Sequence, residues 1–389
     1  MPGGTRSFEM ARRLVAAGHE VHLITSQRES NEYSDWHRTN EEGISVHWYP
    51  VAYSNHMGFF HRLFAFIKFA IASSCKAASI KADVVFATST PLTIVLPGIY
   101  ASWRQKVPMV FEVRDMWPAV PIAMGILKNP LLVSAAIWLE RLAYRRAKHI
   151  VALAPGMRDD VVSSGVDSAK VTVIPNGCDL NVFASDLATP AIALRESLPW
   201  LGSRSLVLFA GTLGRANGVD YLVKVAEYMG QIDPEVRFAI IGDGAAFESI
   251  KSEAVHSKVL NNNLFMFNAI PKSELAVWLA AADFTVGLFS GPKVLWKDAV
   301  QNKFFDSLAA GKPIACNFSG FQSILAVQHD VGLIVDPHNP GLAAVQLHEK
   351  LTDTIWLASV KERAKALAEG QFNRDMLAKD LERVLISVL

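Results

Sequence analysis

Short apolar runs alternate with helical patterns along this chain, and the alternation occurs in two sets. Fully apolar runs separated by helices indicate a parallel sheet that is covered on both faces. The sequence therefore predicts an α/β protein with two Rossmann-like, doubly wound parallel-sheet domains. The predicted strands are residues 20–25, 44–48, 83–87, 109–113, 149–153 and 171–174 in the first set, and 206–210, 237–241, 264–267, 284–288, 314–316 and 332–335 in the second.

A turn-rich stretch at residues 175–183 separates the two sets. We place the domains at residues 1–185 and 186–370, and we expect helix 371–389 to pack back on the first domain. A doubly wound domain usually opens with a strand that leads into a glycine turn, yet Gly3 and Gly4 stand at the very start here. We therefore expect a misassigned start codon, a truncated gene, or a domain without its first strand.

Composition limits the classes of partner. The formal net charge of the 389 residues is +1, so no bulk electrostatic field favours nucleic acid, and no such partner is expected. The three cysteines have neither disulfide nor zinc spacing, which indicates a reducing compartment. An Asp-x-Asp metal motif is absent, so we expect neither a metal nor a cofactor.

The stretch from Asp298 to Pro313 carries the most chemistry. Asp298 lies in a polar, irregular segment, whereas Asp306 lies inside a short apolar-periodic helix that Gly311 ends as a left-handed cap. The N-terminus of that helix offers free N–H groups and a partial positive charge, to which Lys303 adds a full charge. Two carboxylates that flank a phosphate site suit a ligand with hydroxyls at each end of a diphosphate, which describes a nucleotide sugar.

This stretch resembles the E-x7-E region of glycosyltransferase family 4, although Asp replaces Glu at both positions. The resemblance implies a GT-B fold, in which two Rossmann-like domains face a cleft. It also implies that Asp298 contacts the donor sugar and that Asp306 contacts the nucleotide ribose. We assign Asn302 to the donor as well. The alternative is a capped amphipathic helix before a buried strand.

A second candidate site is the glycine turn at residues 209–220. Close backbone approach and a nearby guanidinium suit a diphosphate. Gly211, Thr212 and Asn217 are assigned to the donor, and Arg215 replaces the charge that family members carry at neighbouring positions. The pattern resembles the WbuB-like branch of aminosugar transferases. An ordinary strand-to-helix turn is the alternative.

Three further features complete the donor site that this resemblance implies. Gly242 lies in another strand-terminal turn, and the backbone of Ala269 and Ile270 is expected to read the base. Gly3 and Gly4 are assigned to the donor in the first domain.

Charged residues also follow a strand in the first domain, where open α/β sheets bind ligands. We assign Arg114 and Trp117 to the acceptor and Asp115 to catalysis. An Arg–Asp pair that tethers the loop is the alternative.

Residues 57–80 are aromatic and apolar but are interrupted by Arg62, Lys68 and Lys76. A spanning helix needs about 20 consecutive apolar residues, so this segment fits an interfacial helix on anionic lipid better. The prediction is a cytoplasmic protein that is peripheral on the inner face of the bacterial plasma membrane. A partly covered domain helix is the alternative.

Together these features predict a metal-independent, retaining glycosyltransferase. It would move an N-acetylated deoxyaminosugar from a UDP-sugar to a polyprenyl-diphosphate-linked glycan in O-antigen or capsule assembly. Arg215, Lys303 and helix N–H groups would stabilise the leaving diphosphate. Two alternatives stay open: a UDP-sugar 2-epimerase of the same fold, and a degenerate nucleotide-sugar-binding protein.

Overall fold

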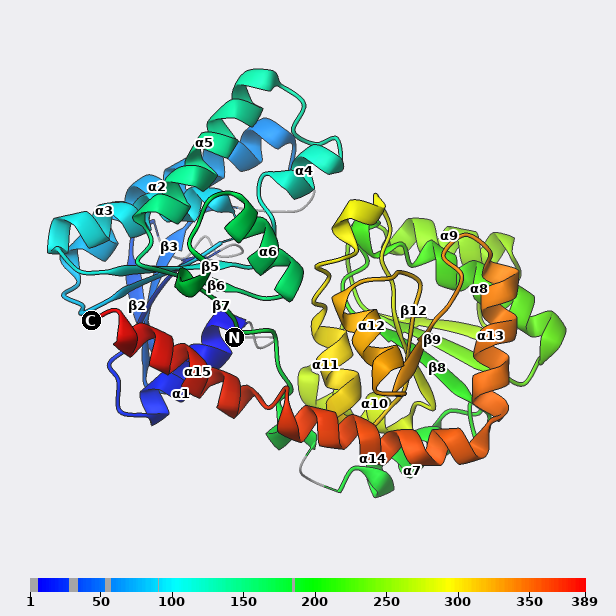
Figure 1. Cartoon of the computed structure of the whole chain (residues 1–389). Helices are drawn as coiled ribbons and strands as arrows, with labels where there is room; N and C mark the ends of the chain where they lie inside the picture. The colour runs from blue at the N-terminus through cyan, green and yellow to red at the C-terminus, as the bar shows by residue number, and fades with distance from the viewer. Residues whose placement is uncertain (1–5, 28–33, 53–56, 90, 184–185) are drawn as a thin grey trace. The chain divides into compact units, whose positions relative to one another are not determined.

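The computed structural model describes residues 6–27, 34–52, 57–89, 91–183 and 186–389, with the side chains of residues 59 and 60 left out. The chain forms two compact units (Figure 1). The N-terminal unit contains Gly4–Pro175 together with Asp375–Leu389, and the C-terminal unit contains Asn176–Arg374. The chain therefore passes from the first unit to the second after Pro175 and returns after Arg374. The first crossing comes about ten residues earlier than the boundary at residue 185 that the sequence predicted.

The N-terminal unit contains two sheets within the described residues, in the orders β1-β3-β2 and β4-β5-β6-β7. All pairs are parallel except β2 with β3. The glycine turn that was expected before α1, at Gly3 and Gly4, falls in residues 1–5, outside the described part of the chain, so the expected lack of a first strand stays a prediction. The elements are α1 Arg6–Ala16, β1 His22–Gln27, β2 His37–Glu41, β3 Ile44–Pro50, α2 Phe59–Ser79, β4 Val85–Thr88, α3 Val95–Gln105, β5 Met109–Val113, α4 Ala119–Ala123, α5 Pro130–Arg146, β6 His149–Ala152, α6 Pro155–Ser163, β7 Val171–Val173 and α15 Arg374–Ser387.

Strand β2 corrects the expectation of purely parallel sheets. It pairs with β3 through a two-residue turn in which Glu42 (φ 50°) and Gly43 (φ 84°) both have positive φ. Such a turn matches the twist of an antiparallel hairpin. The strand, His37–Glu41, is polar and lies at an edge, so it lacks the apolar run that marks buried strands.

Helix α15 closes the core of the N-terminal unit, although it follows the whole C-terminal unit in sequence. Its Leu377, Ala378, Leu381 and Val384 form one buried cluster with Met10 of α1, Val110 of β5, Val151 of β6 and Ile174. Helices α3 and α5 also contact β5 and belong to the same unit.

The C-terminal unit is a six-stranded parallel sheet in the order β10-β9-β8-β11-β12-β13. Alternate residues of β8 point to opposite faces, so that Val207 and Phe209 pack with α8 while Leu206 and Leu208 pack with α10. This confirms the doubly wound prediction. The elements are α7 Ala188–Ser197, β8 Leu206–Ala210, α8 Asp220–Ile232, β9 Arg237–Ile241, α9 Phe247–His256, β10 Leu264–Phe267, α10 Lys272–Ala281, β11 Phe284–Gly287, α11 Asn302–Ala309, β12 Ile314–Cys316, α12 Phe321–Gln328, β13 Gly332–Ile334, α13 Pro340–Thr352 and α14 Thr354–Gly370.

Candidate functional site

The loops that follow β8, β9 and β10 are joined at the carboxyl edge of the sheet. The Gly211 N–H donates to the carbonyl of Ile241 at 2.9 Å, and the Gly242 N–H donates to the carbonyl of Phe267 at 3.0 Å. A β-carbon on Gly242 would lie 1.9 Å from the Gly211 carbonyl oxygen, so only glycine allows this approach. The structure thus brings together two residues that the sequence assigned to the donor.

The segment after Gly211 is braced by its own side chains and by a neighbouring loop. The Asn217 amide donates to the carbonyl of Thr212 at 2.8 Å, and the Ser290 N–H donates to the carbonyl of Ala216 at 2.8 Å. Arg215 begins a short 3-10 turn and is exposed. The Asn217 side chain therefore shapes the loop. The Arg215 side chain is exposed on the same loop and can reach a ligand.

Lys303 is the second residue of α11 and reaches under the glycine turn. Its Nζ lies 3.9 Å from the centroid of the Phe209 ring, and a β-carbon on Gly211 would be 3.4 Å from this Nζ. The ammonium is buried and has no hydrogen-bond partner among the described residues. Burial lowers the pKa of Lys303 to about 7. A buried, unpaired ammonium is costly to a fold, so its presence needs another explanation.

Asp306 lies one turn further along α11 and keeps a small exposed fraction, 17% of its side chain. Together with Lys303, it lines a cavity of about 20 Å³ between α10, α11 and the sheet. That volume is enough for about one water molecule. Burial raises the pKa of Asp306, and the Lys272 ammonium 3.5 Å away opposes that rise.

The other predicted residues of the C-terminal unit lie nearby in sequence. Asp298 is buried in the loop before α11, and Asn302 is the exposed first residue of that helix. Ala269 and Ile270 form the turn between β10 and α10. The division of sugar, ribose and base contacts among these residues stays a prediction.

Lys272 is a residue of this site that the sequence reasoning missed. It is the first residue of α10, and its Nζ lies 2.7 Å from Asp179 and 3.5 Å from Asp306. Basic side chains are unfavourable at helix N-termini because the helix dipole is positive there. A lysine at the first position of a predicted helix therefore indicates, from the sequence alone, that an acidic partner lies nearby.

In the N-terminal unit, the loop after β5 carries Arg114, Asp115 and Trp117. The Arg114 N–H donates to the Ser89 hydroxyl at 2.9 Å, so the loop is held through its backbone. Glu112 inside the strand accepts from Arg6 at 2.8 Å, a buried pair that serves the fold. The roles in acceptor binding and catalysis remain predictions, and Gly3 and Gly4 lie outside the described residues.

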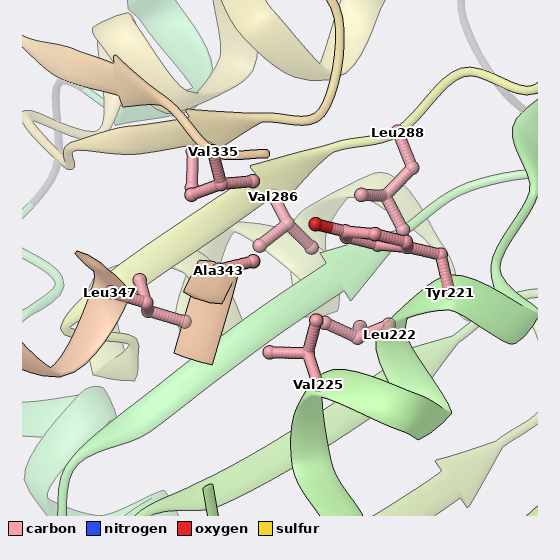
Figure 2. Close-up of a pocket in the computed structure, with 9 residues that line it drawn as sticks. Tyr221, Leu222, Val225, Val286, Leu288, Val335, Ala343 and Leu347 are labelled. Atoms are coloured by element: carbon pink, nitrogen blue, oxygen red, sulfur yellow. The ribbon is translucent and has the colours of Figure 1, made fainter. Parts of the chain in front are cut away.

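A second cavity, shown in Figure 2, belongs to the core and not to this site. It measures about 10 Å³, at the lower limit for one water molecule. Tyr221 is its single polar lining side chain, and the hydroxyl of Tyr221 donates to the carbonyl of Asp336. The remaining lining residues are Leu222, Val225, Val286, Leu288, Ala315, Val335, Ala343 and Leu347.

The described residues lack two features that other transferases of sugars can have. They contain no group of three or more His, Cys, Asp or Glu side chains that could hold a metal ion. Nor do they contain a helix with the length and apolar character needed to cross a membrane.

Comparison with known proteins defines the class. Residues 3–177 match the family described as Glycosyl transferase 4-like domain, and residues 192–367 match Glycosyl transferases group 1. With its two Rossmann-like units, the chain is a glycosyltransferase of the GT-B type. Because the two matches together cover most of its length, we assign it to glycosyltransferase family 4.

Two bacterial relatives are similar over most of the chain. The putative colanic acid biosynthesis glycosyl transferase WcaI of Escherichia coli is 22% identical over 69% of this chain and 69% of its own. The probable glycosyltransferase WbjE of Pseudomonas aeruginosa is 25% identical over 70% of this chain and 67% of its own.

Solved structures show the same fold. Sucrose-phosphate synthase from Thermosynechococcus elongatus superposes with a TM-score of 0.75 at 15% identity, covering 99% of this chain and 93% of that one. Anabaena HepE in complex with UDP-glucose superposes with a TM-score of 0.70 at 15% identity, covering 95% of this chain and 100% of that one.

Proposed function

We propose that this glycosyltransferase moves a sugar from a UDP-sugar to a polyprenyl-diphosphate-linked glycan, with retention of anomeric configuration. The observation that carries the proposal is Lys303. Its ammonium is buried and unpaired within the described chain, yet it lies against Gly211 at the edge of the sheet and shares a cavity with Asp306. A diphosphate would supply the missing counter-charge.

The chemistry follows from where charge develops. As the glycosidic bond to the donor breaks, negative charge grows on the departing UDP and positive charge grows on the sugar. Lys303, the N–H groups at the start of α11 and the exposed Arg215 would stabilise the leaving diphosphate without a metal. Asp306 would accept hydrogen bonds from the ribose, Asp298 would face the sugar, and Asp115 would act from the N-terminal unit.

The choice of substrates is supported by the relatives. The structure of HepE is a complex with UDP-glucose, and WcaI is named for colanic acid biosynthesis. Both are consistent with a UDP-sugar donor and with polysaccharide assembly, including O-antigen or capsule. An N-acetylated deoxyaminosugar is our choice of donor, on the resemblance to the WbuB-like branch.

A panel of UDP-sugars tests the proposal. The preferred donor should raise the melting temperature most, and adding a polyprenyl-diphosphate glycan should release UDP from that donor alone. UDP-sugar conversion to an epimer without acceptor would instead identify the epimerase alternative. Binding without turnover on any acceptor would identify a binding protein.

The proposed membrane surface lies on α2 and α3, which pack against each other in the N-terminal unit (Figure 1). On α2, Phe64 is 70% exposed and Ile71 is 65% exposed, and the two lie on the same face of the helix, about two turns apart. On α3, Trp103 is 68% exposed. Exposed Lys68 of α2 adds positive charge. Apolar and aromatic side chains beside a basic residue suit anionic lipid.

We expect the double variant Phe64→Ser/Ile71→Ser to bind anionic liposomes about 100-fold more weakly or worse, because each side chain stabilises the bound state by roughly 1.5–3 kcal/mol. Vesicle sedimentation measures the effect, with Ile355→Ser, an 84% exposed residue of the C-terminal unit, as the matched control. Equal binding by the original protein and the double variant would exclude this surface.

A further inference from the structure

Four charged side chains from distant parts of the sequence form one cluster under the proposed ribose site. Lys272 lies between two carboxylates, 2.7 Å from Asp179 and 3.5 Å from Asp306. The Arg374 guanidinium pairs with Asp179 as well, and it also donates to the carbonyl of Gly177 at 2.6 Å. The cluster therefore connects the proposed ribose carboxylate to both segments where the chain changes unit.

The two carboxylates have different surroundings. Asp179 is buried, with 3% of its side chain exposed, and pairs with two cations. Asp306 retains 17% exposure and lies farther from the ammonium. Asp179 anchors the lysine, so its ammonium is held beside Asp306. Asp306 keeps oxygen lone pairs available for a ligand.

The position of Lys272 is not explained by the needs of its own helix. This lysine is the first residue of α10, where the helix dipole disfavours a cation. It lies two positions after Ile270, which belongs to the turn that is expected to meet the base.

We propose that Lys272 is a positioning residue for nucleotide recognition: held by Asp179, it keeps the Asp306 carboxylate ionised and oriented toward the ribose hydroxyls. This inference rests on the proposed function, in which Asp306 binds the ribose. It predicts that Lys272 acts on the recognition of the hydroxyls and leaves the diphosphate contacts unchanged.

The test compares UDP with 2′,3′-dideoxy-UDP, which lacks the ribose hydroxyls, by calorimetric titration. The original protein should prefer UDP by about 10- to 150-fold, the range for hydrogen bonds to a charged group. Lys272→Met should reduce that preference by roughly 3- to 10-fold, as expected for coupled neighbours. Affinity for the dideoxy probe should change little, and Lys272→Arg should restore part of the preference.

The matched control is Lys224→Met, since Lys224 also bridges two carboxylates, Glu227 and Glu253, but on the exposed surface of α8 and α9. Equal loss of both probes in Lys272→Met, or an unchanged preference, overturns the inference while the proposed function stands. A parent protein that does not distinguish the probes overturns the ribose role of Asp306 and the inference with it. If Lys272→Met does not fold, Lys272→Gln, which keeps a donor for Asp179, carries the same test.

Discussion

Replacement of Lys303 by methionine is expected to weaken UDP binding by about 1.5–3 kcal/mol, which is about 10- to 150-fold. Methionine has a similar length and no charge, so it can still pack over the Phe209 ring where the lysine now lies. The loss would therefore measure the charge and not the packing. Isothermal titration with UDP is the measurement, and an unchanged affinity would show that Lys303 does not meet the diphosphate.

The same variant should change how stability depends on pH. The pKa of Lys303 is about 7 in the folded protein, against 10.5 for an ordinary lysine. Between these values the unfolded chain binds a proton that the folded chain does not, so stability should rise with pH from about 7 to about 10.5. One such group contributes at most about 1.4 kcal/mol per pH unit. Denaturant unfolding at several pH values should show a shallower slope in Lys303→Met.

UDP should oppose this trend, because a bound diphosphate favours the protonated ammonium. We expect UDP affinity to fall as pH rises above about 7 in the original protein, and to lose that dependence in Lys303→Met. Lys312→Met is the matched control: burial also lowers the pKa of Lys312, which lies outside the proposed site. If Lys312→Met loses the ligand effect as well, the assignment to the diphosphate is wrong.

Asp298→Asn is expected to slow sugar transfer by about 100- to 1000-fold, the cost of removing one preorganised electrostatic contact to the transition state. The amide keeps the shape of the buried side chain but not the charge that would face the developing cation. UDP affinity should stay nearly unchanged, since UDP lacks the sugar. Single-turnover kinetics with excess enzyme separates this effect from donor binding.

Asp306→Asn provides the contrast, because it should weaken UDP itself. Both variants exchange a carboxylate for an amide, at positions that lie eight residues apart. Equal loss of UDP affinity in both would contradict the division of roles between sugar and ribose.

The sequence predicted the buried parts of the fold well. The bounds of β5, β8, β9 and β10 agree with the predicted ranges, because each strand is a short and largely apolar run. Strand β2 escaped prediction because an exposed edge strand has no such run.

The site was harder to predict because its contacts join distant segments. Lys303 and Gly211 could be predicted singly from charge and turn chemistry, yet their close approach depends on β8 and β11 being neighbours in the sheet. Lys272 was missed because its partner Asp179 lies 93 positions away, in the segment that enters the C-terminal unit.

The packing of α15 has a consequence for how the chain is made. Domains generally fold as units, and N-terminal ones do so first during synthesis. Here the N-terminal core includes Leu381 and Val384, so the ribosome must finish the C-terminal unit before that core can close. The second unit to be translated, Asn176–Arg374, is continuous and holds all its own strands. We therefore expect the C-terminal unit to complete its core before the N-terminal unit does, the reverse of the order in which they are translated.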